Sequence, residues 1–465
     1  MRTSRSEQIA AIILKLIEEG HLPPGRRIAS VRAAAQEYGV SKNTVVEAYD
    51  RLVASGALEP RPGSGFYVAA PRRRGVEVRP AHVAAAIDHL SLLREQLDQH
   101  HAVRVGDGRP PPSWMEGSEL RRFLRPRAGL GGGEMEHGYG APQGYAPLRE
   151  RIAHQLIERS IPATSAEVLM TFGANHGLDL IVRHFLEPGD AVFVDSPGYY
   201  PLFGKLRLMG ATLVPILRTA EGPDLEDFEA KAVQHRPKLF FTQALAHNPT
   251  GTSMGLASLH RLLQAAERHG MMVVEDDPFA DILPPMTPRL AALDHLDRVL
   301  YVGTFSKTLS ASLRAGYIAG HRDVIRSLTD VKMLTVVNSS GYVERLIHDL
   351  MAEGHYRHHL RRLRDRVARA SEAAADNLGR LGLTGFSPPS GGYYLWCPLP
   401  DGFDDMALTS RAADAGIFMA PSSIFTLDRV GYRPAIRINV AYADDPRFLG
   451  FMRTELGQRR AAVSA

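Results

Sequence analysis

The spacing of hydrophobic positions divides the chain into two parts. Within residues 5–68, apolar side chains recur at every third or fourth position over three short stretches, which is the period of an amphipathic helix. From about residue 113, short continuous apolar runs alternate with amphipathic segments. Apolar strands separated by helices indicate a mostly parallel sheet that helices cover on both faces. We therefore expect an α/β protein in which a small helical module precedes a large sheet domain.

The chain of 465 residues is too long for one ordinary core. A stretch rich in proline and arginine, which includes Arg72-Arg73-Arg74, reads as a linker. We predict an N-terminal domain over residues 1–70, a linker over 71–104 that is helical in part, and a large domain over 105–465. Within the large domain, a smaller C-terminal α+β subdomain is expected from about residue 340.

Three helices are predicted in the N-terminal domain. The first covers residues 7–19, the second runs from Val31 to Tyr38 behind the N-cap Ser30, and the third runs from Lys42 to about Ala54. A short glycine turn joins the second and third, which makes a helix-turn-helix. The third helix starts with Ser41-Lys42-Asn43-Thr44, whose short donors suit phosphate and base-edge contacts in a major groove.

Residues 58–68 read as a β-hairpin wing with a basic tip, Arg61-Pro-Gly-Ser-Gly65. One interpretation is a small packing domain whose Ser and Asn residues only cap helices. The ordered segments 28–32, 39–46, 48–52 and 61–66, however, resemble the GntR family of winged helix-turn-helix proteins. That resemblance implies seven DNA-contacting residues: Arg32, Ser41, Lys42, Asn43, Thr44, Arg51 and Arg61.

The charge distribution agrees with a nucleic-acid partner. The first 74 residues hold 12 Lys and Arg against 7 Asp and Glu, whereas the whole chain carries only +4. The single cysteine, Cys397, lies in an apolar run, where a buried thiol is expected, and the 19 histidines lack companions at metal spacing, so no metal site is expected. No stretch approaches the roughly 20 apolar residues that span a bilayer, and we expect a cytoplasmic protein.

Lys307 carries the chemistry expected of the large domain. It follows the apolar strand 299–302, with Thr304 and Ser306 before it and Arg314 after it. A lysine amine in such a place condenses with the aldehyde of pyridoxal 5′-phosphate (PLP), while hydroxyls and an arginine hold the phosphate. Taken alone, the same pattern also describes a solvated loop lysine.

Other candidate residues follow other predicted strands. Gly173-Ala174-Asn175 opens a helix, where small residues let backbone N–H groups approach a phosphate. Tyr199 can lie flat on a pyridine ring, and Asn248 offers an amide to the ring's phenolic oxygen. Asp276 supplies a carboxylate that keeps the pyridine nitrogen protonated.

In this order the segments resemble the fold type I, aspartate-aminotransferase-like family, from about residue 105 to the end. The resemblance implies that Lys307 forms an internal aldimine with PLP and that Asp276 and Asn248 are its catalytic companions. It implies that Arg437 binds a substrate carboxylate, and that Tyr139 reaches the phosphate of a neighbouring subunit in a homodimer. The implied cofactor contacts are Tyr139, Gly173, Ala174, Asn175, Tyr199, Asn248, Asp276, Thr304, Ser306, Lys307 and Arg314.

One position departs from that family. A tyrosine usually stands three residues after the aspartate, and Phe279 stands there in this chain. Phenylalanine cannot donate a hydrogen bond to the ring oxygen of the cofactor. We therefore expect the aldimine to be held less tightly and to titrate differently.

Together the two halves resemble the MocR subfamily of GntR regulators. The resemblance implies a PLP-responsive transcription regulator whose partners are operator DNA and an effector, either PLP or an amino compound that displaces Lys307. Two alternatives stay open: a PLP-dependent aminotransferase with an ancillary DNA-binding domain, and a PLP carrier with a vestigial winged helix. A residual aminotransferase half-reaction fits a regulator as well.

A basic run from Arg357 to Arg369 lies on a predicted helix that turns Leu360, Leu363 and Val367 inward. We interpret its outer side as a solvated face, with a second DNA site as the alternative.

Overall fold

The computed structural model describes residues 4–18, 21–61, 64–69, 83, 91–123, 138–384, 391–428 and 432–463. The chain forms two compact units, Met1–Pro80 and Ala81–Ala465. Most of the predicted linker, including Arg72-Arg73-Arg74, lies outside the described residues, as do residues 62 and 63 of the predicted wing tip.

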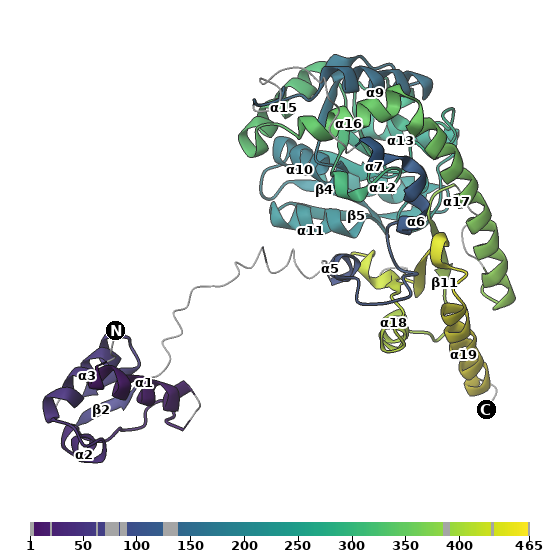
Figure 1. Ribbon diagram of the computed structural model, residues 1–465. Coiled ribbons are helices and arrows are strands. Elements are labelled where there is room, and N and C mark those ends of the chain that lie inside the picture. The colour runs from purple at the N-terminus through teal and green to yellow at the C-terminus, as the bar shows by residue number, and fades with distance from the viewer. Residues whose placement is uncertain are drawn as a thin grey trace. The chain divides into compact units, whose positions relative to one another are not determined.

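Among its described residues, the N-terminal unit consists of three helices and an antiparallel hairpin (Figure 1). Their bounds are α1 Arg5–Glu18, α2 Val31–Glu37, α3 Lys42–Ala54, β1 Leu58–Arg61 and β2 Gly65–Val68. The Oγ atoms of Ser30 and Ser41 accept the N–H groups of Ala33 at 3.3 Å and Thr44 at 3.2 Å. The predicted helix-turn-helix, its two caps and its hairpin are therefore confirmed.

Helix α3 buries one face and exposes the other. Its buried side chains, Val45, Ala48, Tyr49 and Leu52, recur at helical spacing and share a core with α1. The Tyr49 hydroxyl donates to the carbonyl of Ala29 at 2.8 Å, which anchors α3 to the segment that leads into α2. The exposed face of α3 is thereby held in a fixed orientation on its unit.

An eight-stranded sheet forms the centre of the large unit. Its order is β3-β10-β9-β8-β7-β4-β5-β6, in which the run from β9 to β5 is parallel. Strand β10 is antiparallel to both β3 and β9, a reversal that the sequence pattern did not predict. The bounds are β3 Val168–Thr171, β4 Ala191–Ser196, β5 Thr212–Thr219, β6 Gly222–Pro223, β7 Leu239–Thr242, β8 Met272–Asp277, β9 Val299–Thr304 and β10 Gly316–Ala319.

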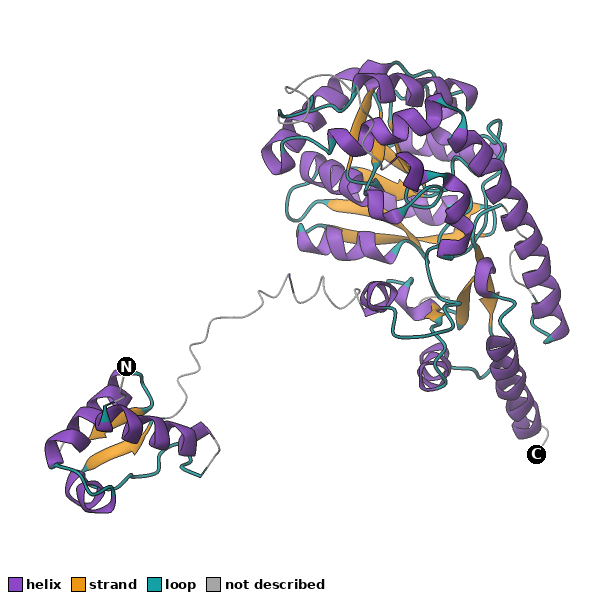
Figure 2. Cartoon of the chain, viewed as in Figure 1, coloured by secondary structure: helices purple, strands orange, loops and turns teal. Residues whose placement is uncertain are grey.

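Helices cover both faces of this sheet, as predicted (Figure 2). Alternate side chains of β4 illustrate the reason, because Phe193 enters one hydrophobic core while Val192 and Val194 enter another. The helices of the large unit are α5 Ser91–Asp98, α6 Pro112–Met115, α7 Leu120–Phe123, α9 Ala146–Glu158, α10 Ala174–Phe185, α11 Tyr200–Leu208, α12 Leu225–His235, α13 Leu256–Arg268, α14 Leu290–Asp294, α15 Arg322–Val336, α16 Gly341–Ala352, α17 His355–Arg380, α18 Asp405–Asp414 and α19 Pro446–Val463.

A second, three-stranded antiparallel sheet lies in the C-terminal part of the chain. Its order is β11-β13-β12, with bounds β11 Tyr394–Pro398, β12 Ala420–Pro421 and β13 Ala435–Asn439. Cys397 is fully buried in the core beside it, and burial raises the pKa of its thiol to about 12, so it is the structural cysteine that the sequence predicts. Within the described ranges, no helix is long and apolar enough to cross a membrane.

Candidate functional site

A cavity of about 460 Å³ opens where the parallel strands of the large sheet end. The carboxyl ends of neighbouring parallel strands meet at one edge, so residues far apart in sequence converge there. Ten of the predicted site residues line this cavity: Ala174, Asn175, Tyr199, Asn248, Asp276, Thr304, Ser306, Lys307, Arg314 and Arg437.

Asp276 is the buried acid of the cavity. Its Oδ2 accepts a hydrogen bond from Gln243 Nε2 at 2.6 Å, while its Oδ1 is buried and has no partner among the described residues. Burial, reinforced by the nearby charge of Asp277, raises the pKa of Asp276 to about 6. Asp277 itself faces away, paired with Arg289 at 2.7 Å and with the Tyr301 hydroxyl at 2.9 Å.

Gln243, which the sequence reading missed, joins two predicted site residues. Its Nε2 donates to Asp276, and its Oε1 accepts the main-chain N–H of Asn248 at 2.7 Å. These opposite roles orient the amide, because only the oxygen accepts and only the nitrogen donates. A polar residue directly after the apolar strand β7 was the available signal.

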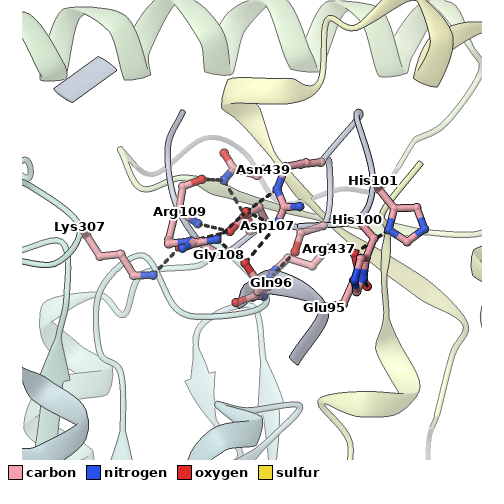
Figure 3. A network of polar contacts seen from close by, with 12 residues as sticks. Glu95, Gln96, His100, His101, Asp107, Gly108, Arg109, Lys307, Arg437 and Asn439 are labelled. Atoms are coloured by element: carbon pink, nitrogen blue, oxygen red, sulfur yellow. Dashed lines mark hydrogen bonds and ion pairs between the residues drawn. The ribbon is translucent and has the colours of Figure 1, made fainter. Parts of the chain in front are cut away.

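The Lys307 amine already has a partner (Figure 3). Its Nζ donates to the carbonyl of Gly108, which also accepts the Tyr394 hydroxyl at 2.8 Å. The Lys307 carbonyl accepts the Tyr393 hydroxyl at 2.6 Å. The lysine is therefore held at both its main chain and its amine.

A group of side chains suited to an anion lies in the same cavity. Helix α10 starts after Gly173, whose φ of +78° favours glycine. A Cβ there would lie 2.9 Å from Arg314 Nη2, so the glycine allows the guanidinium to approach the helix N-terminus. Arg314 also donates to Ser306 Oγ at 3.4 Å, and Ser306 lies 3.1 Å from Thr304 Oγ1. Guanidinium, hydroxyls and helix N-terminus together suit a phosphate.

Arg437 is 1 % exposed and lies between two rings, 4.6 Å from the Tyr394 centroid and 5.0 Å from that of Phe425. One of its terminal nitrogens donates to Asn248 Oδ1 at 2.8 Å and the other to the Gly106 carbonyl at 2.6 Å. Its Nε is buried without a partner within the described part of the chain. The guanidinium is thus preorganised at the cavity wall, where it can bind a carboxylate.

Three residues singled out in the sequence do not line the cavity. Gly173 directly precedes Ala174, which does. Tyr139 is 86 % exposed. Phe279 is fully buried, with its ring centroid 5.2 Å from that of Tyr393 and 5.5 Å from that of Tyr394. In the described ranges, no group of three or more His, Cys, Asp or Glu residues is arranged to hold a metal ion.

The predicted DNA contacts lie on the surface of the N-terminal unit. Ser41, Lys42 and Asn43 are exposed at the start of α3, and Thr44 is half-buried beside them. Arg32 is exposed on α2. The other two arginines, Arg51 and Arg61, form ion pairs with carboxylates of the same unit.

Arg51 donates to Glu7 at 3.1 Å and to Glu47 at 3.2 Å. Arg61 pairs with Glu59 at 2.9 Å and lies 4.3 Å from the centre of the Tyr67 ring. Exposed ion pairs of this kind contribute little free energy, so a phosphate competes with them easily.

Each half of the chain matches a known protein family. Residues 103–447, well over half of the chain, match the aminotransferase class I and II family, and residues 5–68 match the bacterial regulatory proteins of the gntR family. The chain belongs to the class I and II aminotransferase family. It is a GntR-type transcription regulator whose helix-turn-helix domain is fused to an aminotransferase domain.

Similar proteins have the same composite architecture or its second half. The HTH-type transcriptional regulator YdfD of Bacillus subtilis is 27% identical and covers 97% of both chains. The probable rhizopine catabolism regulatory protein MocR of Rhizobium meliloti is 32% identical over 74% of this chain and 71% of its own. The crystal structure of LysN, an alpha-aminoadipate aminotransferase of Thermus thermophilus complexed with N-(5'-phosphopyridoxyl)-L-leucine, has a TM-score of 0.71. It is 28% identical and covers 80% of this chain and 97% of its own.

Class I and II aminotransferases in general bind PLP, and the cavity residues fit that cofactor. The unpartnered Oδ1 of Asp276 is a buried acceptor for a protonated ring nitrogen. The space beside Gly173, which a Cβ would fill, and the Arg314 guanidinium suit a phosphate. Lys307 supplies an amine on the same cavity wall.

Proposed function

We propose that this regulator binds operator DNA through its N-terminal unit and responds to PLP, or to PLP with an amino compound, held on Lys307. The observation that carries the proposal is the convergence of Lys307, Asp276, Asn248 and Arg314 on one cavity in a chain that also has a GntR helix-turn-helix. A dedicated enzyme has no use for the second feature.

The roles of the site residues follow from their chemistry. When bound, PLP supplies an aldehyde that links covalently to an amine. Lys307 would supply that amine, and Asp276 would hold a proton on the ring nitrogen. Asn248 and Tyr199 would hold the ring, and the phosphate would be held by Gly173, Ala174, Asn175, Thr304, Ser306 and Arg314.

The response to a ligand depends on contacts that Lys307 and Arg437 make with the segment 106–108. Lys307 Nζ donates to the Gly108 carbonyl, and Arg437 donates to the Gly106 carbonyl (Figure 3). Arg104 ties the same segment to α5, because it donates to Asp107 Oδ2 at 2.9 Å and to the Gln96 carbonyl at 3.1 Å. A lysine amine that is bound covalently, and an arginine that holds a carboxylate, compete with these contacts.

A ligand shifts a conformational equilibrium only by the difference in its binding to the two states. The bonds from Lys307 and Arg437 to the segment 106–108 supply such a difference, since a ligand would use the same donor groups. This segment follows α5, which lies within the predicted linker of residues 71–104 and belongs to the large unit. The segment and α5 are the part of the large unit through which occupancy changes DNA binding.

A homodimer completes the proposal. The side chain of Tyr139 is free to reach a neighbouring subunit, because 86 % of it is exposed. Large apolar side chains are exposed along the end of α15 and the start of α16, among them Leu334 at 89 % and Tyr342 at 68 %. Such exposure on a folded surface is typical of a protein–protein interface.

The test is a fluorescence-anisotropy titration of the full chain against DNA from immediately upstream of its own gene, with and without PLP. We expect tight binding that unrelated competitor DNA does not remove, and an affinity that PLP shifts in the wild type but not in Lys307→Ala. Weak, salt-sensitive binding that ignores both PLP and sequence would contradict the proposal.

The second candidate function is a working aminotransferase with an ancillary DNA-binding domain. Arg437 favours it, because a preorganised guanidinium beside the cavity suits the carboxylate of an amino acid. The likeness to an alpha-aminoadipate aminotransferase favours it as well. Steady turnover of an amino donor and a keto acid, abolished in Lys307→Ala, would support this function, whereas a single half-reaction without turnover supports the regulator.

A further inference from the structure

The first half of α17 presents arginines to solvent. This long helix runs along one edge of the large unit (Figure 1). Its own residues Leu360, Leu363 and Val367 are buried on the inner side of the helix, as the sequence predicts. Five exposed arginines therefore form the outer side, named here the α17 basic face: Arg357, Arg361, Arg362, Arg364 and Arg369.

No ion pair to these five arginines exists in the part of the chain that the structure describes, although the exposed Asp365 stands one helical turn from Arg361 and from Arg369. Arg362 donates to the Gly117 carbonyl and Arg364 to the Asp281 carbonyl at 2.7 Å, so both bind uncharged main-chain acceptors. Arg357, Arg361 and Arg369 have no partner among the described residues. Along residues 355–371, Asp365 is the single acidic residue.

Among the described residues, no carboxylate on the elements packed beside the helix pairs with these arginines, and this includes Glu116, which precedes Gly117. Glu119 lies 3.5 Å from Arg122 and 3.4 Å from His355, and Glu353 lies 3.5 Å from His355. These two carboxylates therefore pair with Arg122 and His355, which precede Arg357, the first arginine of the basic face. Arg121 of α7 is exposed and adds another cation to this side of the unit.

The composition of the face selects the kind of partner. A protein interface is usually anchored by buried aromatic or apolar side chains, and a membrane-bound helix needs an apolar side. The described part of α17 has no exposed large hydrophobic side chain. What remains is a row of guanidinium groups about 18 Å long, at 1.5 Å per residue from Arg357 to Arg369. Guanidinium groups bind phosphates, and duplex DNA displays phosphates over such a length.

We propose that the α17 basic face is a second DNA-contacting surface, which binds the phosphate backbone of duplex DNA without reading its sequence. The inference rests on the proposed DNA-binding function. Contacts to phosphates add affinity and salt dependence but carry no base information. Sequence is read by α3 of the N-terminal unit, and the aminotransferase domain holds further duplex.

The test uses the full chain and an 80-base-pair duplex from immediately upstream of its gene, beside a scrambled duplex of the same composition. Affinity is measured from about 50 to 250 mM salt. The variant is the triple Arg357→Gln/Arg361→Gln/Arg369→Gln. The matched control is Arg151→Gln/Arg261→Gln/Arg453→Gln, which removes the same charge from exposed arginines on α9, α13 and α19.

Each phosphate contact contributes about 0.9 to the slope of log affinity against log salt. We expect the slope of the basic-face variant to fall by about 2–3 on both duplexes, with its preference for the upstream duplex unchanged. The control variant should keep the wild-type slope. Lysines at the same three positions should restore most of it, which excludes misfolding as the cause.

Three results would overturn the inference. One is a basic-face variant whose slope of log affinity against log salt equals that of the wild type, because the face then does not bind DNA. Another is an equal loss in the control variant, which would report net charge alone. The third is a loss confined to the upstream duplex, which would mean sequence reading. A wild type without preference for the upstream duplex would instead contradict the operator function, and the slope comparison would still stand.

Discussion

Asp276→Asn should stabilise the cofactor-free protein and at the same time weaken its hold on PLP. Burial raises the pKa of this carboxyl from 3.8 to about 6, because the charged form loses hydration that its neighbours do not replace. The folded state therefore binds the proton more tightly than the unfolded chain. That proton supplies stability below the ordinary pKa, and the stability is lost as the pH rises through about 6.

A shift of about two pKa units corresponds to about 3 kcal/mol, at 1.36 kcal/mol per unit. Asparagine has the same shape, carries no charge, and keeps an oxygen to accept Gln243 Nε2. The cofactor-free variant should thus be more stable than the wild type by about 3 kcal/mol above pH 7 and by about half as much at pH 5. At saturating PLP the variant should no longer be more stable than the wild type, because only the wild type keeps the carboxylate that binds the cofactor and is stabilised by it in full.

The assay is urea unfolding of cofactor-free protein followed by tryptophan fluorescence, at pH 5 and pH 8. The two tryptophans, Trp114 and Trp396, both belong to the large unit, so the signal excludes the N-terminal unit. A variant that is less stable than the wild type at pH 8, or a difference that does not change between the two pH values, would refute the reasoning.

Three further predictions concern neighbouring positions. Gln243→Leu leaves Asp276 and the Asn248 N–H without a partner, so PLP titrations followed by absorbance should show affinity reduced tenfold or more. Lys332→Met removes the amine that donates to Pro142 O, Met170 O and Ser339 Oγ, and urea unfolding should show a loss of roughly 3–5 kcal/mol; Lys332→Arg, which keeps the charge, should lose less. Phe279→Tyr adds a hydroxyl, and the pH titration of the bound cofactor's absorbance should shift; an unchanged titration would contradict the expected role of Phe279.

Local signals were enough to predict the N-terminal unit. Ser30 and Ser41 cap helices through contacts within three residues, and the buried positions of α3 follow the helical period. The ion pair between Arg51 and Glu7 joins residues 44 positions apart and has no local signature. This is why a residue predicted to touch DNA was not also predicted to carry an internal partner.

The large unit also contains site residues with a local sequence signal and site residues without one. Asp276, Thr304 and Lys307 were found because each stands at the end of an apolar strand, and parallel strands bring their ends together. Gly108 could not be found, because its contact with Lys307 spans 199 residues and uses only a main-chain carbonyl. Every residue type has a main-chain carbonyl, so no sequence pattern marks this contact.

The position of these unpredicted contacts bears on how a regulator can use an enzyme fold. An enzyme gains from a site that is rigid with and without ligand, since preorganised groups need no rearrangement during reaction. Here Asp276 Oδ1 is buried without a partner among the described residues, while Lys307 and Arg437 hold the segment 106–108 through Gly108 and Gly106. In the proposed function, a ligand that pairs with Asp276 and engages Lys307 and Arg437 would satisfy the first group and compete with the contacts of the other two. The free energy gained at Asp276 would then drive the exchange of contacts at the segment. The Asp276→Asn variant should therefore uncouple DNA affinity from PLP even at concentrations high enough to fill the cavity.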